Sequence, residues 1–546
     1  MNDFSRRSFL GGSGATLLRG VATPLLAGVA VANPASAVEA QVRSAARSGQ
    51  NIVCFMPDTV RADVLGCYGN AIARTPNLDQ LAREGVLFEE CHSAYPICGA
   101  SRCSMLTGWP TSVRGHRSQM YFLRPDEPNL FRYLRQADYD VFWAGKNDAL
   151  AALSFDGSVT AWDIQNEGAA PEAAAGRGAG AKQAASRPPG PLTFISAGAP
   201  GDRRHTDDYR CIEAATRILS RRETPRPYLL FLATGAPHPP YNAPEGFAGL
   251  HSPADVTDLL PTNLPNRPAH LKRMLQTYGL DSVSPDVYRK IRATYLDKTA
   301  YVDWLLGQLM ESIERTNHKA DTSLFVLSDH GDYAGDFGLV EKWPSGMERC
   351  LTHVPLIARV PGGKAGHRVE EPVELFDFMA TSLELAGTQA SHTHFARSLM
   401  PQILGSEGDR ERGAFTEGGF NTYEPQCFEP APAKNTWYYD RLHLQIAEPE
   451  TVSRVAAVRT AQYTFVSRPQ GVSELYLRKD DPQERHNRFG EASLTAIQHA
   501  AEQRLLHWYV NTTGIAPMDR DPRGFPEIVP MPEFPKDTAN RILDAG

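Results

Sequence analysis

A cysteine in front of a short run of small residues is the first candidate for chemistry in this sequence. Residues 98–108 read CGASRCSMLTG, with Cys98 leading and Arg102 four positions further on. Small residues suit the tight start of a helix, where free backbone N–H groups and the positive end of the dipole favour an anionic ligand. Arg102 would lie one turn later on the same face and could orient that ligand. A lone cysteine is more often just a buried side chain, so the other motifs decide its role.

Residues 98–108 resemble the signature of the type I sulfatases, which is Cys-x-Pro/Ala-x-Arg followed by Leu-Thr-Gly. In that family the cysteine is oxidised to formylglycine, an aldehyde whose hydrate is the nucleophile. Ala100 stands where proline is commoner, a variant that the family also contains. The resemblance implies that a formylglycine-generating enzyme modifies Cys98 and that Arg102 is one of the catalytic residues.

Potential ligands follow two apolar runs of the chain. Asn51–Asp58 (NIVCFMPD) is typical of a buried parallel strand and ends in Asp58, and residues 323–327 form a similar run before Asp329 and His330. Open α/β sheets bind their ligands at the carboxyl ends of the strands. An acid at a strand end can also simply cap the next helix, and this alternative stays open for Asp58 taken alone.

The family resemblance covers both of these segments. Sulfatases usually have Asp-Asp-x-Arg after the first strand, whereas residues 58–61 read DTVR, so Thr59 cannot supply the second carboxylate. Residues 328–332 (SDHGD), with Lys342 further on, are very like the later sulfatase pattern. The divalent cation that the resemblance implies would be held by Asp58, Asp329, His330 and an oxygen of the modified Cys98. Carboxylate oxygens suit Ca²⁺, Mg²⁺ or Mn²⁺; the resemblance favours Ca²⁺, and the other two ions stay open as alternatives.

Basic residues elsewhere complete the set that the resemblance implies. Lys146 stands where the family has a lysine that contacts sulfate, and His238 lies in a Pro-His-Pro-Pro segment like the family's Pro-His-x-Pro. Arg102, Lys146 and Lys342 would surround the charge that develops on the non-bridging oxygens. His238 or Lys342 would protonate the departing alcohol. The family has a histidine where this chain has Asp148, so the base that regenerates the aldehyde stays open.

The function that these residues predict is hydrolysis of a sulfate ester to an alcohol and inorganic sulfate by an arylsulfatase-like sulfuric ester hydrolase. The substrate would be a sulfated small molecule or glycan, selected by loops within residues 147–165, 241–290 and 415–440. Three further polar residues in or near such loops are more simply interpreted as solvated than as substrate-binding: His116, Glu417 and Glu424.

Two other functions stay open. A phosphonate monoester or phosphodiester hydrolase of the same superfamily also uses formylglycine, and a single acid after the first strand occurs among such enzymes. An inactive relative that binds sulfated polymers belongs to a different class, and it would carry an unmodified Cys98 and no metal. Against the inactive relative, nearly every catalytic position is filled, with Thr59 and Asp148 as the departures.

The fold that positions these residues is predicted to be α/β. The resemblance implies an alkaline phosphatase-like fold, with a large, mixed, mostly parallel sheet sandwiched by helices, one of which covers residues 294–315 on its 3.6-residue periodicity. Probable strands Tyr463–Ser467 and Glu474–Leu477, with a final helix over residues 492–510, indicate a smaller C-terminal domain of antiparallel sheet plus helix. We expect a catalytic domain at residues 48–405, with a flexible Ala/Gly/Pro-rich insertion at 167–191, and the smaller domain at 406–546.

The N-terminus is typical of an export signal. Residues 5–10 (SRRSFL) form a twin-arginine pattern, and an apolar run and the small residues 35–37 (ASA) follow. The apolar stretch at residues 20–32 is too short to span a bilayer, so no transmembrane anchor is expected. We therefore predict that residues 1–37 direct the protein through the twin-arginine translocation machinery, so that it is periplasmic or otherwise exported.

Composition excludes several classes of protein. The chain has 546 residues, 42% of them hydrophobic and 22% charged, with a formal net charge of −7. A nucleic-acid binder would show a basic face, so no nucleic-acid partner is expected. Eight cysteines are too few in this length for a disulfide scaffold, and no CxxC pair suggests zinc.

Overall fold

The structure is a computed structural model in which residues 49–164, 201–222, 224–429, 438–516 and 541–542 are described. The predicted export signal, residues 1–37, and the predicted insertion, residues 167–191, lie outside these ranges. No helix within the described ranges is long and apolar enough to cross a membrane.

The largest sheet has nine strands in the order β10-β2-β9-β7-β1-β6-β4-β5-β16. Within this described sheet, β9 alone is antiparallel to its neighbours, and every other pair is parallel. The expected mixed, mostly parallel sheet is therefore confirmed. The strands are β1 (Asn51–Asp58), β2 (Val86–Phe88), β4 (Asp140–Gly145), β5 (Ala161–Ile164), β6 (Tyr228–Pro237), β7 (Thr322–Leu327), β9 (Leu356–Arg359), β10 (His367–Val369) and β16 (Arg541–Ile542).

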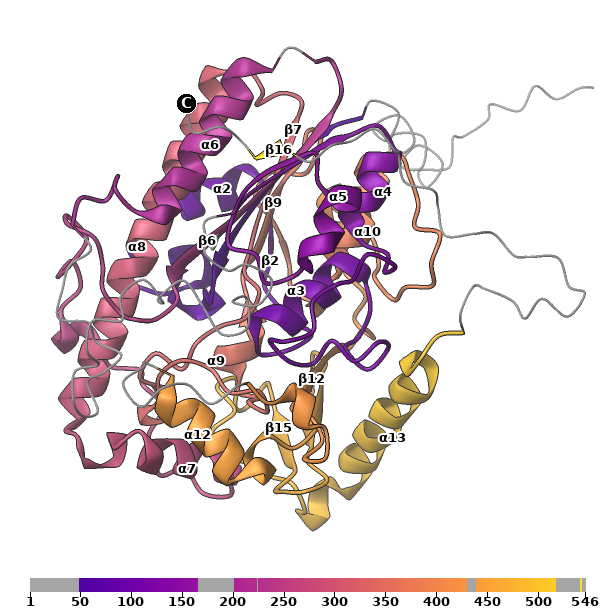
Figure 1. Cartoon of the computed structure of the whole chain (residues 1–546). Helices are drawn as coiled ribbons and strands as arrows, with labels where there is room; N and C mark the ends of the chain where they lie inside the picture. Colours follow the sequence, from indigo (N-terminus) through magenta and orange to yellow (C-terminus); the bar gives the residue numbers. More distant parts are fainter. Residues whose placement is uncertain (1–48, 165–200, 223, 430–437, 517–540, 543–546) are drawn as a thin grey trace, which may run out of the picture. The chain divides into compact units, whose positions relative to one another are not determined.

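Helices cover both faces of this sheet (Figure 1). The α-helices are α2 (Pro76–Glu84), α3 (Cys98–Thr107), α4 (Leu130–Gln136), α5 (Phe155–Ser158), α6 (Asp207–Arg221), α7 (Ala269–Thr277), α8 (Pro285–Arg315), α9 (Arg349–Thr352), α10 (Asp377–Leu385), α11 (Met400–Ile403), α12 (Tyr439–Ala447) and α13 (Thr495–Thr512). Val53 and Phe55 of β1 pack in a core with α2, α6 and α8, whereas Cys54 and Met56 pack in a second core with α3, α4 and α10. Successive side chains of a strand point to opposite faces, so β1 must be apolar throughout to fill both cores.

Helix α8 begins earlier than the sequence pattern predicted. Its 31 residues start at Pro285, not at residue 294. The side chain of Ser284 accepts a hydrogen bond from the backbone N–H of Asp286 at 3.1 Å, and Pro285 takes the first helical position. A serine cap followed by proline is a helix-start signal, which the apolar periodicity alone did not include.

Two smaller sheets follow the large one. The expected antiparallel sheet has the order β12-β13-β14-β15, and α13 packs on it with Trp508 stacked on Phe415 at 4.7 Å. The helix predicted over residues 492–510 is thus α13. A three-stranded sheet, β11-β3-β8, was not predicted, because its strands are only two residues long. The strands of the smaller sheets are β3 (Cys91–His92), β8 (His353–Val354), β11 (Val373–Glu374), β12 (Ala414–Gly418), β13 (Val455–Arg459), β14 (Tyr463–Ser467) and β15 (Glu474–Leu477).

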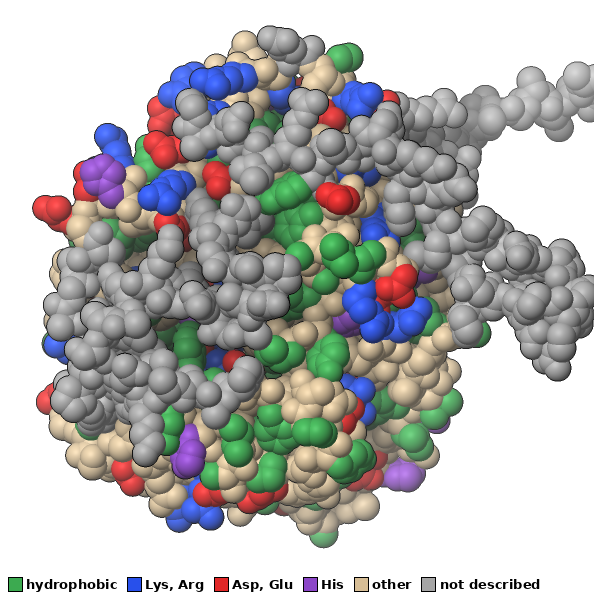
Figure 2. Space-filling view, viewed as in Figure 1, with side chains coloured by type: hydrophobic (Ala, Val, Ile, Leu, Met, Phe, Trp, Pro, Cys, Tyr) green, Lys and Arg blue, Asp and Glu red, His purple; other side chains and the backbone are tan. Residues whose placement is uncertain are grey.

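Charged side chains of both signs are interspersed on the visible part of the surface. Figure 2 shows Lys and Arg next to Asp and Glu across this face. A mixed surface of this kind is ordinary for a globular protein and matches a modest formal charge of −7.

Candidate active site

Three of the predicted ligands meet where two central strands end. Strands β1 and β7 are parallel neighbours, so their carboxyl ends lie at the same edge of the sheet. Asp58 is the last residue of β1, and Asp329 and His330 follow the end of β7. All three side chains are fully buried, at 0% exposure. The Nε2 atom of His330 lies 3.7 Å from Asp58 Oδ1 and 3.9 Å from Asp329 Oδ2.

Cys98 joins this group from the start of a helix, as predicted. It is the first residue of α3, after Ile97 in an extended conformation. Its Sγ lies 3.1 Å from His330 Nε2 and 3.6 Å from Asp58 Oδ1. One ligand atom from each of Asp58, Cys98, Asp329 and His330 lies within 4.8 Å of the other three. The four positions proposed as metal ligands thus form one buried cluster.

The donor set of this cluster suits a divalent cation. The Nδ1 atom of His330 faces the backbone carbonyl of Gly331 at 2.7 Å and must donate its hydrogen there, because a carbonyl only accepts. The lone pair of Nε2 is therefore directed at the cluster, as in histidines that ligate metals. Burial holds the pKa of His330 down at about 4, so the imidazole is neutral at physiological pH. Carboxylate oxygens from Asp58 and Asp329 complete a set that fits Ca²⁺, Mg²⁺ or Mn²⁺.

Arg102 and Lys146 supply positive charge beside the two acids. Arg102 Nε donates to Asp329 Oδ2 at 2.8 Å, and its Nη2 lies 3.5 Å from Asp58 Oδ2. Lys146 Nζ donates to Asp58 Oδ2 and lies 2.8 Å from Asp148 Oδ2. Burial opposes ionisation of Asp58, but the charges of Lys146 and Arg102 lower its pKa well below the usual range. Asp58 is therefore an anion, held between fixed cations.

The thiol of Cys98 is a poor nucleophile as it stands. Burial raises its pKa well above the ordinary value, and the negative charge of Asp58 raises it further. Lys146, whose Nζ lies 3.6 Å from Sγ, and Lys342 only partly oppose this shift. Since the thiolate is the reactive form of cysteine, the unmodified side chain is unsuited to attack.

His238 and Lys342 lie together on another side of the site. Lys342 Nζ is 2.8 Å from His238 Nε2, which connects the end of β6 to the loop after β7. His238 Nδ1 faces the carbonyl of Pro239 at 2.8 Å and donates to it. Burial and the neighbouring charge of Lys342 lower the pKa of His238. In its neutral form Nε2 therefore accepts a hydrogen bond from Lys342.

Two residues that sequence reasoning did not identify hold this pair. Glu341 Oε1 lies 2.9 Å from Lys342 Nζ and 3.3 Å from His238 Nε2, and its Oε2 accepts from Arg441 Nη1 at 2.9 Å. Glu341 directly precedes a predicted site residue, and this adjacency was the one signal that could have indicated it. Arg441 comes from α12, and the sequence offered no signal for it.

The departures from the family pattern have structural roles of their own. Thr59 has a φ of 66°, and its backbone N–H donates to Asp329 Oδ1 at 3.2 Å. Its hydroxyl is buried and has no hydrogen-bond partner among the described residues. Asp148, in place of the family's histidine, forms an ion pair with Lys146. Neither residue adds a fifth group to the metal cluster.

The interpretation of His116 and Glu417 as solvated residues is wrong. His116 is 5% exposed and lies 3.1 Å from Glu127, and Glu417 is 2% exposed. Glu417 accepts a hydrogen bond from the Thr111 hydroxyl at 2.9 Å. Glu424 is partly exposed, with an ion pair to Arg117 at 3.6 Å. The polar residue types suggested solvent, but pairing within the fold allows their burial.

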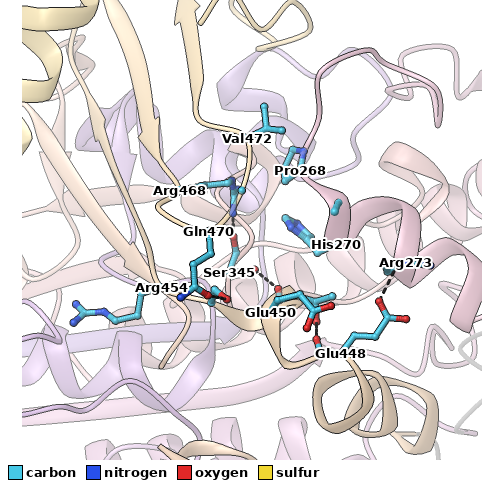
Figure 3. A pocket seen from close by; sticks show the side chains of 14 residues that line it. Pro268, His270, Arg273, Ser345, Glu448, Glu450, Arg454, Arg468, Gln470 and Val472 are labelled. Atoms are coloured by element: carbon cyan, nitrogen blue, oxygen red, sulfur yellow. Dashed lines mark hydrogen bonds and ion pairs between the residues drawn. The ribbon is translucent and has the colours of Figure 1, made fainter. Parts of the chain in front are cut away.

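A separate cavity of about 160 Å³ lies between α7 and the turn connecting β14 to β15. Figure 3 shows side chains of both charge signs around it, including Arg273 and Glu448, which pair at 2.9 Å. None of the residues proposed for catalysis or metal binding lines this cavity.

Comparisons with known proteins identify the family. The family model "Sulfatase" matches residues 50–388. Human iduronate 2-sulfatase is 27% identical over 389 residues, which cover 66% of this chain and 69% of that protein. Two solved structures share the fold at a TM-score of 0.66, and each match covers 85% of this chain. One is the phosphonate monoester hydrolase of Agrobacterium radiobacter, at 21% identity over 96% of that chain. The other is a protein in complex with its substrate D-glucosamine-2-N,6-O-disulfate, at 18% identity over 98% of that chain.

The family match includes both strand-end motifs and the start of α3, where the buried cluster was found. The sheet order and the helices on its two faces agree with the alkaline phosphatase-like fold of the structural neighbours. The chain therefore belongs to the sulfatase family of the alkaline phosphatase superfamily, and it is an enzyme of the sulfuric ester hydrolase class.

Proposed function

We propose that this enzyme hydrolyses a sulfate ester with formylglycine at position 98 and a divalent cation bound beside it. The observation that carries the proposal is the convergence of Cys98, Asp58, Asp329 and His330 within 4.8 Å at the carboxyl edge of the sheet. A metal cation and a modified side chain would then lie together in one buried cluster, close to Arg102 and Lys146.

The state of the unmodified thiol supports conversion of Cys98. A buried cysteine with a raised pKa is protonated at neutral pH and attacks sulfur poorly. Formylglycine, when present, supplies a hydrated aldehyde with one hydroxyl for attack and a second for releasing sulfate. Gly99 donates its backbone N–H to Gln119 Oε1 at 2.6 Å, which fixes the first turn of α3 beside the reacting position.

The cation would be held by Asp58, Asp329, His330 and the modified side chain. When bound, it supplies positive charge that lowers the pKa of a ligated hydroxyl and offsets the charge of the sulfate. Three oxygen-bearing ligands favour Ca²⁺. The single histidine makes Mn²⁺ an alternative, and Mg²⁺ is a further alternative because of the carboxylates.

The basic residues of the chain bind and orient the anionic substrate. Arg102 and Lys146 hold the carboxylates of Asp329 and Asp58 and present further N–H groups to the sulfate oxygens. The Lys342–His238 pair supplies the proton for the departing alcohol, and the 2.8 Å contact between its two nitrogens supports a shared role. Lys342 carries that proton, because His238 Nε2 is an acceptor in the neutral pair.

A second candidate function is hydrolysis of a phosphonate monoester or phosphodiester. The observation that favours it is Thr59, which leaves β1 with one carboxylate at a position where most sulfatases have two. The phosphonate monoester hydrolase of Agrobacterium radiobacter shares the fold. Rates on 4-nitrophenyl sulfate and on the 4-nitrophenyl monoester of phenylphosphonate, measured with the same preparation, separate the two functions.

The alcohol carrying the sulfate is proposed to belong to a sugar or another small molecule. A structural neighbour was solved with a sulfated glucosamine, which supports a sulfated glycan as the first substrate to test. We also propose export through the twin-arginine machinery by residues 1–37 and a catalytic domain that ends near residue 405.

Co-expression tests the proposed function. The protein is produced with and without a formylglycine-generating enzyme, and each preparation is assayed on 4-nitrophenyl sulfate with added Ca²⁺ or Mn²⁺. Activity should appear only where position 98 is modified. Equal sulfatase activity in the unmodified preparation would contradict the proposal.

A further inference from the structure

We propose that Glu341 is a positioning residue for protonation of the leaving group, and that Arg441 of α12 holds it in place. The proposal deepens the proposed sulfate ester hydrolysis and rests on it. It concerns the side of the site occupied by His238 and Lys342, and it assigns a role to a carboxylate that ligates no metal in the cluster described above.

Three side chains form a closed triangle. Lys342 Nζ lies 2.8 Å from His238 Nε2 and 2.9 Å from Glu341 Oε1, and His238 Nε2 lies 3.3 Å from the same oxygen. The side chain of Lys342 is 3% exposed and that of Glu341 is fully buried. A lysine ammonium has three N–H donors. In Lys342 one points to His238 and one to Glu341, and the third is left for the substrate. The carboxylate of Glu341 thus fixes the direction in which Lys342 offers its remaining proton.

The hydrogen-bond pattern also determines where the transferable proton lies. His238 donates through Nδ1 to the carbonyl of Pro239 and accepts from Lys342 through Nε2. An oxygen at position 98, having lost its proton to water, forms a bond to sulfur while the S–O bond to the alcohol breaks. The electron pair of the broken bond stays on the leaving oxygen, and one proton passes from Lys342 Nζ to that oxygen. The pair changes from a single positive charge to neutral, and water returns the proton after the alcohol leaves. If Glu341 lost its negative charge, the Lys342 ammonium would lose the carboxylate that holds it beside His238.

Arg441 compensates the charge of Glu341 after the proton has left. Its Nη1 donates to Glu341 Oε2 at 2.9 Å, and its Nη2 donates to Glu429 at 3.2 Å. Burial alone would favour the neutral acid, but Arg441 and Lys342 lower the pKa of Glu341 well below its usual range. The carboxylate therefore stays ionised in both states of the lysine. This pairing joins the C-terminal part of the chain to the leaving-group side of the site.

The backbone at Glu341 gives an independent indication that the carboxylate is needed. Its φ is 68°, in the left-handed region that glycine adopts at less cost. Its backbone N–H donates to Tyr241 Oη at 3.0 Å and to Asp332 Oδ1 at 3.1 Å, and its carbonyl accepts from the N–H of Tyr333 at 2.8 Å. Strained residues held by several surrounding bonds cluster at functional sites. A glycine would relieve the strain, but it would remove the group that contacts Lys342 and His238.

The test is the dependence of kcat on the leaving group in Glu341→Gln. Modified wild type and variant are assayed on a series of aryl sulfates from 4-nitrophenyl, whose phenolate leaves without a proton, to phenyl and 4-methoxyphenyl. General acids contribute about 10²- to 10⁴-fold, so kcat of the variant should fall by about 100-fold on the poorest leaving group and by less than about 3-fold on 4-nitrophenyl sulfate. KM and the affinity for inorganic sulfate, measured by calorimetry, should change little.

Glu417→Gln is the matched control. Glu417 is also buried and paired with an arginine, Arg454 at 3.1 Å, but it contacts none of the proposed catalytic residues among the described parts of the chain. It should show no dependence on the leaving group. An equal loss on every aryl sulfate in Glu341→Gln, or a loss in KM alone, would overturn the proposal.

A misfolded variant and an inactive wild type have different consequences. If Glu341→Gln does not fold, Arg441→Lys replaces it; a smaller loss that still grows as the leaving group worsens is expected, and a uniform loss overturns the proposal. If modified wild type hydrolyses no sulfate ester, the proposed function fails before any variant is assayed. A failure of the inference instead requires an active wild type.

Discussion

The two sides of the active site are built in different ways. On the metal side, Asp58, Asp329 and His330 lie at the ends of neighbouring parallel strands, and Cys98 starts a helix beside them. On the leaving-group side, Lys342 and His238 are held by Glu341 and by Arg441 from α12. The metal side depends on the register of the central sheet, whereas the leaving-group side depends on loops and on a helix from the C-terminal part of the chain.

This difference separates two kinds of requirement. The metal side must keep several ligands in a fixed geometry, which rigid strand ends provide. The leaving-group side must hold a proton donor, and the positive charges of Lys342 and Arg441 are balanced there by the carboxylate of Glu341 between them. We expect changes on the metal side to affect every substrate equally and changes on the leaving-group side to depend on the alcohol.

The largest effect is expected for Cys98→Ala. This change removes the group that is proposed to become the nucleophile, and loss of a catalytic nucleophile typically costs about 10⁴-fold or more in kcat. Hydrolysis of every sulfate in the aryl series should fall together, as measured by steady-state rates. A normally active Cys98→Ala protein would contradict the role of position 98 as the nucleophile.

The next effect is the loss of metal binding in Asp329→Asn. Metal at 100 times its Kd should stabilise the wild type by about 2.7 kcal/mol, which appears as a rise in Tm after a chelated sample receives Ca²⁺ or Mn²⁺. The variant should lose most of this rise together with activity. Asp332→Asn is the control, because burial already raises the pKa of Asp332 to about 7 and no ligand atom of the cluster belongs to it. An unchanged metal response in Asp329→Asn would contradict the ligand assignment.

A smaller effect is expected for Asp148→Asn. Asp148 contacts Lys146, which already donates to Asp58, so loss of one carboxylate leaves the lysine with a partner. We expect a decrease in kcat of no more than about tenfold, equal for good and poor leaving groups, because the residue lies away from the Lys342–His238 pair. A loss confined to poor leaving groups would show that Asp148 acts on the leaving-group side and would contradict this expectation.

The smallest expected effect concerns stability: the free energy of unfolding of the metal-free protein should depend on pH. Burial lowers the pKa values of His330, His353 and His392 to about 4, whereas unfolded histidine titrates near 6.5. Between these values the unfolded chain binds protons that the folded chain does not, so the free energy of unfolding is greatest above pH 6.5 and falls as the pH drops towards 4. Urea denaturation at pH 7, 6 and 5 measures it. A constant free energy over this range would contradict the neutral, buried state of these histidines.

Much of the metal side could be predicted from the sequence. Asp58, Asp329 and His330 each follow an apolar run, and parallel strands bring such positions to one edge without further information. Cys98 was found through its motif and the small residues that start α3. Very short strands and the exact start of a helix were harder to predict. Strands β3, β8 and β11 have only two residues each. Helix α8 begins at a serine cap that lies outside its apolar repeat.

The leaving-group side could be predicted only in part. His238 and Lys342 were found by their resemblance to family motifs, but Glu341 and Arg441 were not. Their contact joins residues 100 positions apart and requires a left-handed φ at Glu341, which neither propensity nor periodicity indicates. The buried state of His116 and Glu417 was missed for the same reason, since pairing with distant groups decides whether a charge can be buried.

Mass spectrometry of the peptide covering residues 84–102 tests the central claim most directly. Trypsin releases this peptide with both Cys91 and Cys98, and tandem fragmentation assigns any change to one of them. In protein purified from its native source, we expect that Cys98 has lost its sulfur and become an aldehyde, while Cys91 remains a thiol. An intact thiol at Cys98 in a preparation that hydrolyses sulfate esters would contradict formylglycine as the nucleophile.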